Sequence, residues 1–264
     1  MAARYTLNEL FAVLIARDLR PDDRVIMIGA GLPAARAGAA MANMTRLPDA
    51  RVVLGLTVEN LTAMDRAPDV LPLLFDPRML EGGEAYMFQH QIFDEMSWPD
   101  VFFLGGFQVD RRGNVNLLGI RENGGWAVHG PGALAQATMS TYCRGYYIVM
   151  AHHDRRTFVE SVACISALGD RERRRALRIP GGGPRLILSP LGVFELDQDG
   201  NMRIVSLNEG VSAERLRQST GFDIGPSPDA PVTEAPSPAE LTFLRERVDT
   251  QGILRGESMA SGRI

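Results

Sequence analysis

The segment of residues 24–54 most constrains what this chain can fold into. Residues 24–28 and 51–54 are short apolar runs of the kind that make buried strands. Between them, the glycine loop GAGLP leads into an alanine-rich stretch, residues 34–44, and its Pro33 suits the first turn of a helix. A strand, a helix and a second strand in this order predict two parallel strands joined by a right-handed crossover.

Length and charge exclude several classes of protein. The 264 residues suffice for one large α/β domain, or two small ones, with a real core. The net charge of −4 gives no reason to expect nucleic acid. No apolar run reaches the roughly 18 residues of a membrane span, and the first ten residues lack the apolar core of a signal peptide. Cys143 and Cys164 have no metal-binding spacing, so we expect no metal site and a cytoplasmic location.

The chain is predicted to form one main domain. Residues 1–224 are assigned to an α/β domain, and residues 225–264 to a Pro-rich linker, a C-terminal helix and a flexible tail packed on the same domain. Two helix starts are marked by capping-box spacing, one at Thr6 with Glu9 and one at Ser237 with Glu240.

Residues 101–120 predict a strand interrupted by glycines and then a hairpin. Residues 101–104 are apolar, two glycines follow at once, and the strand resumes at residues 107–109. Glycines inside a strand mark a bulge or a close approach to the backbone. The sequence DRRG then has the residues of a four-residue turn, and residues 114–118 return as the second arm. A second hairpin is predicted over residues 193–206.

The sequence GGFQVDRRGNVN in this stretch resembles the signature of the B (β) subunits of the family I coenzyme A transferase superfamily, which contains glutaconate CoA-transferase. The opening helix, GAGLP, HHDRRTF, LGVFEL, STGFD and PSPAEL also occur in the order seen in those subunits, so the resemblance covers nearly the whole chain. It implies an α/β fold with an open, mostly parallel sheet sandwiched by helices, with β-hairpins.

The resemblance also implies partners and substrate. An A (α) subunit is expected to form an α2β2 heteromer with this chain and to share the active site. The substrate is expected to be an acyl-CoA thioester. No tightly bound cofactor is expected, and coenzyme A enters as part of the substrate.

The catalytic glutamate of true transferases is missing from its expected position. The resemblance implies a B-subunit glutamate six residues beyond a Pro-Asp pair, at the end of the strand after the first crossover helix. This nucleophile forms an acyl anhydride and then a glutamyl-CoA thioester. Here the pair is Pro48-Asp49, and the sixth residue on is Gly55. Glu59 lies four residues later, and could serve only if the loop carries an insertion; otherwise it is a solvated loop carboxylate.

A B-type chain without this glutamate resembles the non-transferase branch of the superfamily. That branch includes hydrolases that open the last rings of CoA-activated steroid fragments, and a glutaconyl-CoA-type decarboxylase. In the steroid hydrolases the B-type chain has Gly at this position, and the A-type chain is thought to supply the catalytic acid. We therefore expect hydrolysis or ring opening of a CoA-activated alicyclic or steroid-derived acid. The alternatives are a genuine glutaconate- or 3-oxoacid-type transferase that uses Glu59, and a nucleotide-binding or non-catalytic partner subunit.

The nucleotide alternative rests on the first glycine loop. Gly29-x-Gly31-x-x-Ala34 fits the dinucleotide fingerprint between a strand and a helix. That fingerprint also needs an acid at the end of the next strand, which here ends at Leu54-Gly55. The loop matches the V-G-x-G-L-P loop of the transferase B subunits more closely.

The predicted site combines three groups of residues. Backbone N–H groups would hold the thioester oxyanion, and the candidates are Gly29, Gly31, Gly55, Gly105 and Gly106. The side-chain amides of Gln108 and Asn116 would position the thioester, or brace the glycine loops. A substrate pocket, or simply a structural loop, would be formed by Trp126, His129, Gly130 and Gly132.

Three further residues carry no predicted metal or nucleophile role. Neighbouring histidines alternate faces on a strand, so His152 and His153 do not predict a metal site. Cys143 has no Cys-His-acid order around it and is expected to be a small buried hydrophobe.

Overall fold

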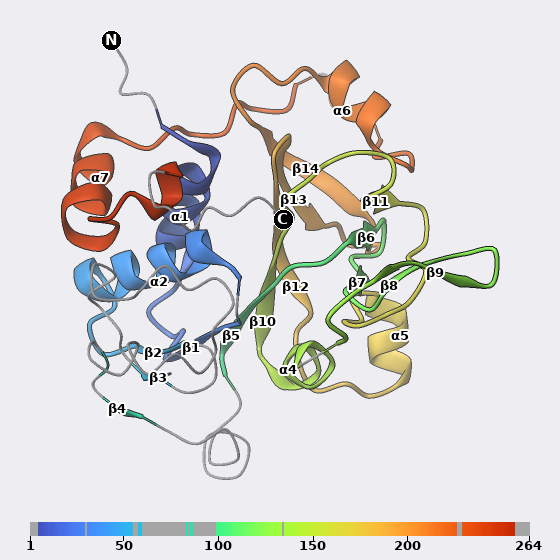
Figure 1. Ribbon diagram of the computed structural model, residues 1–264, viewed down its shortest axis with the longest axis horizontal. Helices are drawn as coiled ribbons and strands as arrows, with labels where there is room; N and C mark the ends of the chain where they lie inside the picture. The colour runs from blue at the N-terminus through green and yellow to red at the C-terminus, as the bar shows by residue number, and fades with distance from the viewer. Residues whose placement is uncertain are drawn as a thin grey trace. The chain divides into compact units, whose positions relative to one another are not determined.

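The computed structural model describes residues 5–29, 31–54, 58–59, 83, 85–86, 99–133, 135–225 and 229–256. The chain divides into two compact units, whose elements are labelled in Figure 1. Unit 1 consists of Met1–Phe103 together with Ala235–Ile264, and unit 2 of Leu104–Glu234. The domain boundary predicted between residues 224 and 225 stays a prediction.

Unit 1 is built on three parallel strands. β1 (Val25–Ile28) lies between β2 (Arg51–Leu54) and β5 (Val101–Leu104), and both neighbours run parallel to it. The helix α2 (Pro33–Thr45) joins β1 to β2. The crossover predicted for residues 24–54 is therefore confirmed.

Two short antiparallel strands follow β2. β3 (Val58–Glu59) returns beside β2, so that Glu59 lies opposite Val53, and β4 (Ala85–Tyr86) pairs with β3 in turn. Most of residues 56–99 lie outside the described residues, as does Gly55.

The first helix, α1 (Leu7–Asp18), packs closely on α2. A side chain at Gly38 of α2 would place its Cβ 2.6 Å from the Ala12 carbonyl oxygen and 2.8 Å from the Ile15 Cβ atom. Glycine at this position therefore allows the two helices to approach. The capping box predicted at the start of α1 is confirmed, because Thr6 and Glu9 bond each other's backbone N–H groups.

The C-terminal segment packs beside these helices, although it is more than 200 residues away in sequence (Figure 1). Helix α7 (Pro238–Phe243) continues as a π-helical turn over Leu244–Val248, and a short 3₁₀ helix follows at Ile253–Arg255. Ser237 and Glu240 form the capping box that the sequence predicts. No helix that the structure describes is both long and apolar enough to cross a bilayer.

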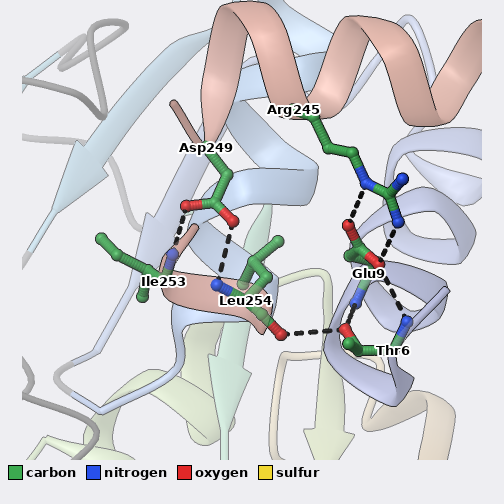
Figure 2. Close-up of polar contacts among 6 residues, drawn as sticks. All are labelled: Thr6, Glu9, Arg245, Asp249, Ile253 and Leu254. Carbon is green, nitrogen blue, oxygen red and sulfur yellow. Dashed lines mark hydrogen bonds and ion pairs between the residues drawn. The ribbon is translucent and has the colours of Figure 1, made fainter. Parts of the chain in front are cut away.

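A cluster of polar contacts, drawn in Figure 2, fastens this segment to α1. The Nε and Nη2 atoms of Arg245 donate hydrogen bonds of 2.6 and 3.0 Å to the fully buried Glu9 carboxylate. The Thr6 hydroxyl donates to the Leu254 carbonyl, and Asp249 accepts from two N–H groups of the 3₁₀ helix. Burial raises the pKa of Glu9, but the hydrogen bonds from Arg245 and Thr6 and the positive charges outweigh it and leave that pKa below its usual value.

Four strands of unit 2 lie side by side. β10 (Gly145–Val149) runs parallel to β12 (Pro184–Ser189), and β13 (Gly192–Leu196) and β14 (Met202–Leu207) follow antiparallel. The second predicted hairpin is therefore confirmed. Each unit combines parallel and antiparallel strands with helices, which confirms the predicted α/β class. The large side chains that this unit buries completely are those of Tyr146, Tyr147, Phe158 and Phe194.

The hairpin that follows the two glycines belongs to a separate small sheet. β6 (Gln108–Asp110) pairs with β7 (Val115–Asn116) and with β11 (Phe158–Val159). The expectation that β5 resumes as β6 in one strand is wrong, because the glycines let the chain leave one sheet and enter another. Strand β11 is only two residues long.

Two antiparallel strands form an exposed ribbon. β8 (Gly119–Glu122) and β9 (Gly125–His129) are joined by the turn Asn123-Gly124, whose φ angles are 49° and 81° (Figure 1). Both turn residues thus have the positive φ of a type I′ turn, whose twist matches the flanking strands. The expectation of a glycine loop around Trp126 and His129 is wrong, because both residues lie on β9. The helices of unit 2 are α4 (Gln136–Tyr142), α5 (Arg171–Ala176) and α6 (Ala213–Ser219).

Candidate functional site

The Gly105–Gly106 segment connects β5 to β6 and leaves two backbone donors unused. Among the described residues, neither the Gly105 nor the Gly106 N–H donates a hydrogen bond, whereas the next N–H, that of Phe107, donates to Asn116. Both glycines are half-buried. A Cβ at Gly106 would lie 2.4 Å from the Val115 side chain and 2.9 Å from the Asn116 carbonyl oxygen, so only glycine fits. The segment therefore offers N–H groups to an oxygen of a ligand.

Gln108 and Asn116 face each other across β6 and β7. The Asn116 Nδ2 donates to Gln108 Oε1 at 2.9 Å and to the Gly119 carbonyl at 2.8 Å. The Asn116 Oδ1 accepts from the N–H groups of Leu118 and Gly119. An asparagine side chain has two donor hydrogens and about two acceptor positions, so Asn116 is fully engaged within the chain. Of the two roles that the sequence left open, this geometry favours bracing; the role in positioning a thioester stays a prediction.

The turn between β6 and β7 is braced in the same way. Asp110 accepts hydrogen bonds from the backbone of Arg112 and from both the backbone and the side chain of Asn114. The Asn114 Oδ1 accepts from the N–H groups of Gly169 and Asp170, which ties the turn to the start of α5. Burial raises the pKa of Asp110, although these hydrogen bonds oppose the rise. The turn that follows the glycine segment is thus held rigid.

The other glycine segment lies in unit 1, directly after β1. Gly31 has a φ of +77° and open space where a side chain would be. A Cβ added at Gly29 would lie 3.8 Å from the Phe103 carbonyl oxygen. The residue before α2, Leu32, gives no side-chain cap. The segment therefore leaves the start of α2 without a capping side chain. Whether Gly29, Gly31 and Gly55 contact a ligand stays a prediction.

The predicted pocket residues lie on the exposed ribbon and at its base. Trp126 is 45% exposed, packs edge-on against His129 with ring centroids 5.3 Å apart, and has the Arg121 guanidinium 5.2 Å from its centroid. A Cβ at Gly130 would meet the Leu117 carbonyl at 2.3 Å, while Gly132 has open space around it. These contacts explain why the ribbon base needs glycine. They do not test the predicted substrate pocket.

One contact to the glycine segment was missed by the sequence reasoning. The side chain of Gln136, at the first turn of α4, donates a hydrogen bond of 2.7 Å from Nε2 to the Gly105 carbonyl. The two residues are 31 positions apart, and no local pattern links them. In the part of the chain that the structure describes, no cluster of three His, Cys, Asp or Glu residues is arranged to hold a metal ion.

Three known proteins are similar to this chain in sequence over nearly its whole length. The chain is 33% identical to the B subunit of 3-oxoadipate CoA-transferase from Pseudomonas knackmussii, over 91% of this chain and 92% of that protein. It is 28% identical to the B subunit of glutaconate CoA-transferase from Acidaminococcus fermentans, over 93% of each. It is also 28% identical to the cholesterol ring-cleaving hydrolase IpdB subunit of Mycobacterium bovis, over 94% of this chain and 96% of that protein.

The fold matches a solved member of the same group. The crystal structure of glutaconate coenzyme A-transferase from Acidaminococcus fermentans superposes with a TM-score of 0.79, over 96% of this chain and 99% of that one, at 24% identity. No protein-family model matches the chain. On its sequence and fold, the chain belongs to the B subunits of the family I CoA-transferase superfamily.

Proposed function

We propose that this chain is the B-type member of a two-subunit enzyme that acts on acyl-CoA thioesters, with an A-type subunit completing the active site. The observation that carries the proposal is the pair of unused N–H groups at Gly105 and Gly106. When a nucleophile adds to a thioester, negative charge develops on the carbonyl oxygen, and pre-oriented N–H groups stabilise that charge without reorganising.

Within this class, we favour hydrolysis or ring opening of a CoA-activated alicyclic or steroid-derived acid. In the sequence, Gly55 lies six residues beyond Pro48-Asp49, where the transferase glutamate is expected. Glu59 is on the returning strand β3, opposite Val53, rather than directly after β2. A chain without a nucleophile here would leave the A-type subunit to supply the acid or base that activates water. The similarity to a cholesterol ring-cleaving hydrolase subunit supports this choice.

The second candidate is a genuine CoA transferase with Glu59 as its nucleophile. The 33% identity to a chain of 3-oxoadipate CoA-transferase favours it. In that mechanism the Glu59 carboxylate attacks the thioester, which gives an acyl anhydride and CoA thiolate. The thiolate then attacks the glutamyl carbonyl, which gives glutamyl-CoA and releases the first acid, and a second acid takes over the CoA by the same two steps in reverse. A nucleotide-binding or non-catalytic subunit is the third candidate. Binding of NAD is the less favoured form of it, because β2 ends without the acid that the fingerprint needs.

One assay separates these candidates. The chain, co-expressed with an A-type subunit, is incubated with butyryl-CoA, glutaryl-CoA and 2-oxocyclohexanecarbonyl-CoA, each with and without acetate. Free thiol and new CoA esters are followed together. Free CoA or a ring-opened ester without acetate supports the hydrolase. A new CoA ester that forms only with an acceptor acid supports the transferase.

A negative result also has a defined meaning. Thermal stabilisation of the complex by NAD, with none by any of the three CoA esters, would overturn the proposal in favour of the nucleotide-binding candidate. Turnover by the A-type subunit alone, at the rate of the complex, would show that this chain is a non-catalytic partner.

A further inference from the structure

We infer that Gln136 is a positioning residue that aims the Gly106 N–H at the reacting oxygen of the substrate. The inference deepens the proposed function and rests on it, because it concerns the same peptide group. Gln136 is 6% exposed and lies on α4, so its side chain is surrounded by protein and not by solvent. Its amide reaches the Gly105 carbonyl at 2.7 Å.

The direction of this hydrogen bond fixes the direction of the neighbouring N–H. The Gly105 carbonyl and the Gly106 N–H belong to one peptide group, which is trans. In a planar trans peptide, the C=O and N–H bonds point in opposite directions. Since the carbonyl points at Gln136, the Gly106 N–H points away from Gln136. A rotation of the peptide would have to break the hydrogen bond to Gln136.

The orientation of the Gln136 amide is determined by its two partners. A carbonyl oxygen can only accept, so the atom that faces Gly105 must be the Nε2 donor. The Oε1 atom then faces the Ser166 hydroxyl at 2.9 Å. Ser166 is 2% exposed, and its oxygen also accepts from the Leu117 N–H at 3.0 Å. The chain of contacts therefore runs from the loop after β7 through Ser166 and Gln136 to the glycine peptide.

Steric contacts hold the other side of the same peptide. The Cα of Gly106 is so close to Val115 and Asn116 that no Cβ fits. The Phe107 N–H donates to the Asn116 carbonyl at 2.8 Å, which fixes the next peptide. Glycine would otherwise be the most flexible residue in the chain. The hydrogen bond from Gln136 orients the Gly106 N–H before the substrate binds. The peptide therefore does not have to rotate during the reaction.

The test uses the complex of this chain with its A-type subunit and two variants, Gln136→Met and Gln136→Glu. Methionine has a similar volume and no amide, and an ionised glutamate cannot donate to the Gly105 carbonyl. For the best ester of the three named above, we expect kcat to fall by about 10- to 100-fold and KM to change by less than about threefold, since an oxyanion donor acts on the transition state. Gln136→Glu should recover part of its kcat as the pH is lowered, because a protonated carboxyl donates again.

A second readout does not depend on turnover. The amide ¹⁵N resonance of Gly106 reports the hydrogen bond to the preceding carbonyl, and we expect it to shift in both variants. The matched control is Ser140→Ala, on the same helix, whose buried hydroxyl donates to the Ala137 carbonyl of its own helix and to no other described residue. This control should leave kcat, KM and the Gly106 resonance unchanged.

The outcomes divide clearly. An unshifted Gly106 resonance in both variants would overturn the inference, as would a shifted resonance with kcat within about twofold of wild type. A fall in kcat matched by an equal fall in the folded fraction would assign Gln136 to stability alone. If the wild-type complex turns over no ester, the proposed function fails, and the Gly106 resonance still decides whether Gln136 orients this peptide.

Discussion

The imidazole of His153 lies parallel to the ring of Phe158, with ring centroids 3.5 Å apart and planes 9° apart. Both ring nitrogens have hydroxyl partners: Nδ1 lies 2.7 Å from Ser189 Oγ, and Nε2 lies 3.1 Å from Thr220 Oγ1. The Thr220 hydroxyl donates to the Leu216 carbonyl, so it accepts from Nε2–H, and Ser189 donates to Nδ1. His153 is therefore held neutral. Burial lowers its pKa to about 3, although the nearby Asp154 charge opposes the shift.

This neutral histidine should make the protein less stable in mild acid. The unfolded chain binds a proton at His153 near pH 6.5, and the folded chain does not until about pH 3. The stability that His153 contributes is thus present above pH 6.5 and is lost as the pH falls. At pH 5 the loss amounts to roughly 2 kcal/mol. Urea unfolding between pH 7.5 and pH 5 measures it. The fall in the free energy of unfolding between pH 7.5 and pH 5 should disappear in His153→Gln and persist in the exposed control His152→Gln. An unchanged fall in His153→Gln would contradict the assignment.

Removing the Asn116 side chain should destabilise the small sheet of unit 2. Asn116→Ala deletes four hydrogen bonds, three of them buried, and leaves the carbonyl of Gly119 without its side-chain donor. We expect the free energy of unfolding to fall by about 2–3 kcal/mol. Gln218→Ala is the control, because it removes an exposed hydrogen bond to Glu214 and should cost less than about 0.5 kcal/mol. Equal effects in the two variants, measured by urea unfolding, would rule out the bracing role.

Two arginine–glutamate pairs of unit 1 should differ in their contribution to stability. Arg245→Met leaves the fully buried Glu9 carboxylate without its charge partner, which is expected to cost about 3–5 kcal/mol. Arg17→Met breaks a partly exposed pair with Glu240, at 2.7 Å, and is expected to cost about 1 kcal/mol or less. The difference in urea midpoints between the variants is the measurement. A larger loss for Arg17→Met would mean that burial does not decide the value of the pair.

Glu59→Ala should leave thioester turnover unchanged within about twofold. Glu59 lies on β3 opposite Val53, and Gly55 occupies the position after β2. Removal of a carboxylate nucleophile that forms the covalent intermediate would instead abolish transfer. Steady-state kcat and KM of the two-subunit complex are measured with and without acetate, with Glu59→Asp alongside. Loss of activity in Glu59→Ala at an unchanged melting temperature would establish the transferase mechanism.

The two cysteines should react very differently with an alkylating reagent. Burial raises the pKa of the Cys143 thiol to about 12, and the thiol has no exposed surface. Cys164 is only half-buried. Because the thiolate is the reactive form, native protein treated with iodoacetamide near pH 8 should gain a single adduct by mass, on Cys164. Cys164→Ser should gain none, and a native adduct on Cys143 would show that this thiol opens to solvent.

Local sequence signals predicted the elements that depend on local chemistry. The capping residues Thr6 and Ser237 mark the starts of α1 and α7, and Pro33 begins α2. The β8–β9 ribbon was missed although Asn123-Gly124 is a strong hairpin signal. The adjoining glycines made the region look like a loop. The break between β5 and β6 was missed because an apolar run cannot show which sheet each arm will join.

The candidate site divides in the same way. The Gly105–Gly106 pair and its partners Gln108 and Asn116 are neighbours in sequence, and the hairpin brings them together as a turn pattern predicts. Gln136 contacts Gly105 only because α4 packs beside the glycine segment. That contact depends on tertiary packing, which no periodicity in one sequence encodes.

The split of unit 1 between the two ends of the chain governs the order in which the protein can fold during synthesis. Unit 2 is continuous in sequence, so all of its strands have left the ribosome before the last residues of unit 1 are added. Helix α1 is made before unit 2, but Arg245, which pairs with the buried Glu9 of α1, is made 236 residues after Glu9. Synthesis adds roughly 5–20 residues per second, so Glu9 has no Arg245 to pair with until on the order of ten seconds or more after α1 is made. Helix α1 is therefore among the last elements to reach its final packing, although it precedes unit 2 in the chain.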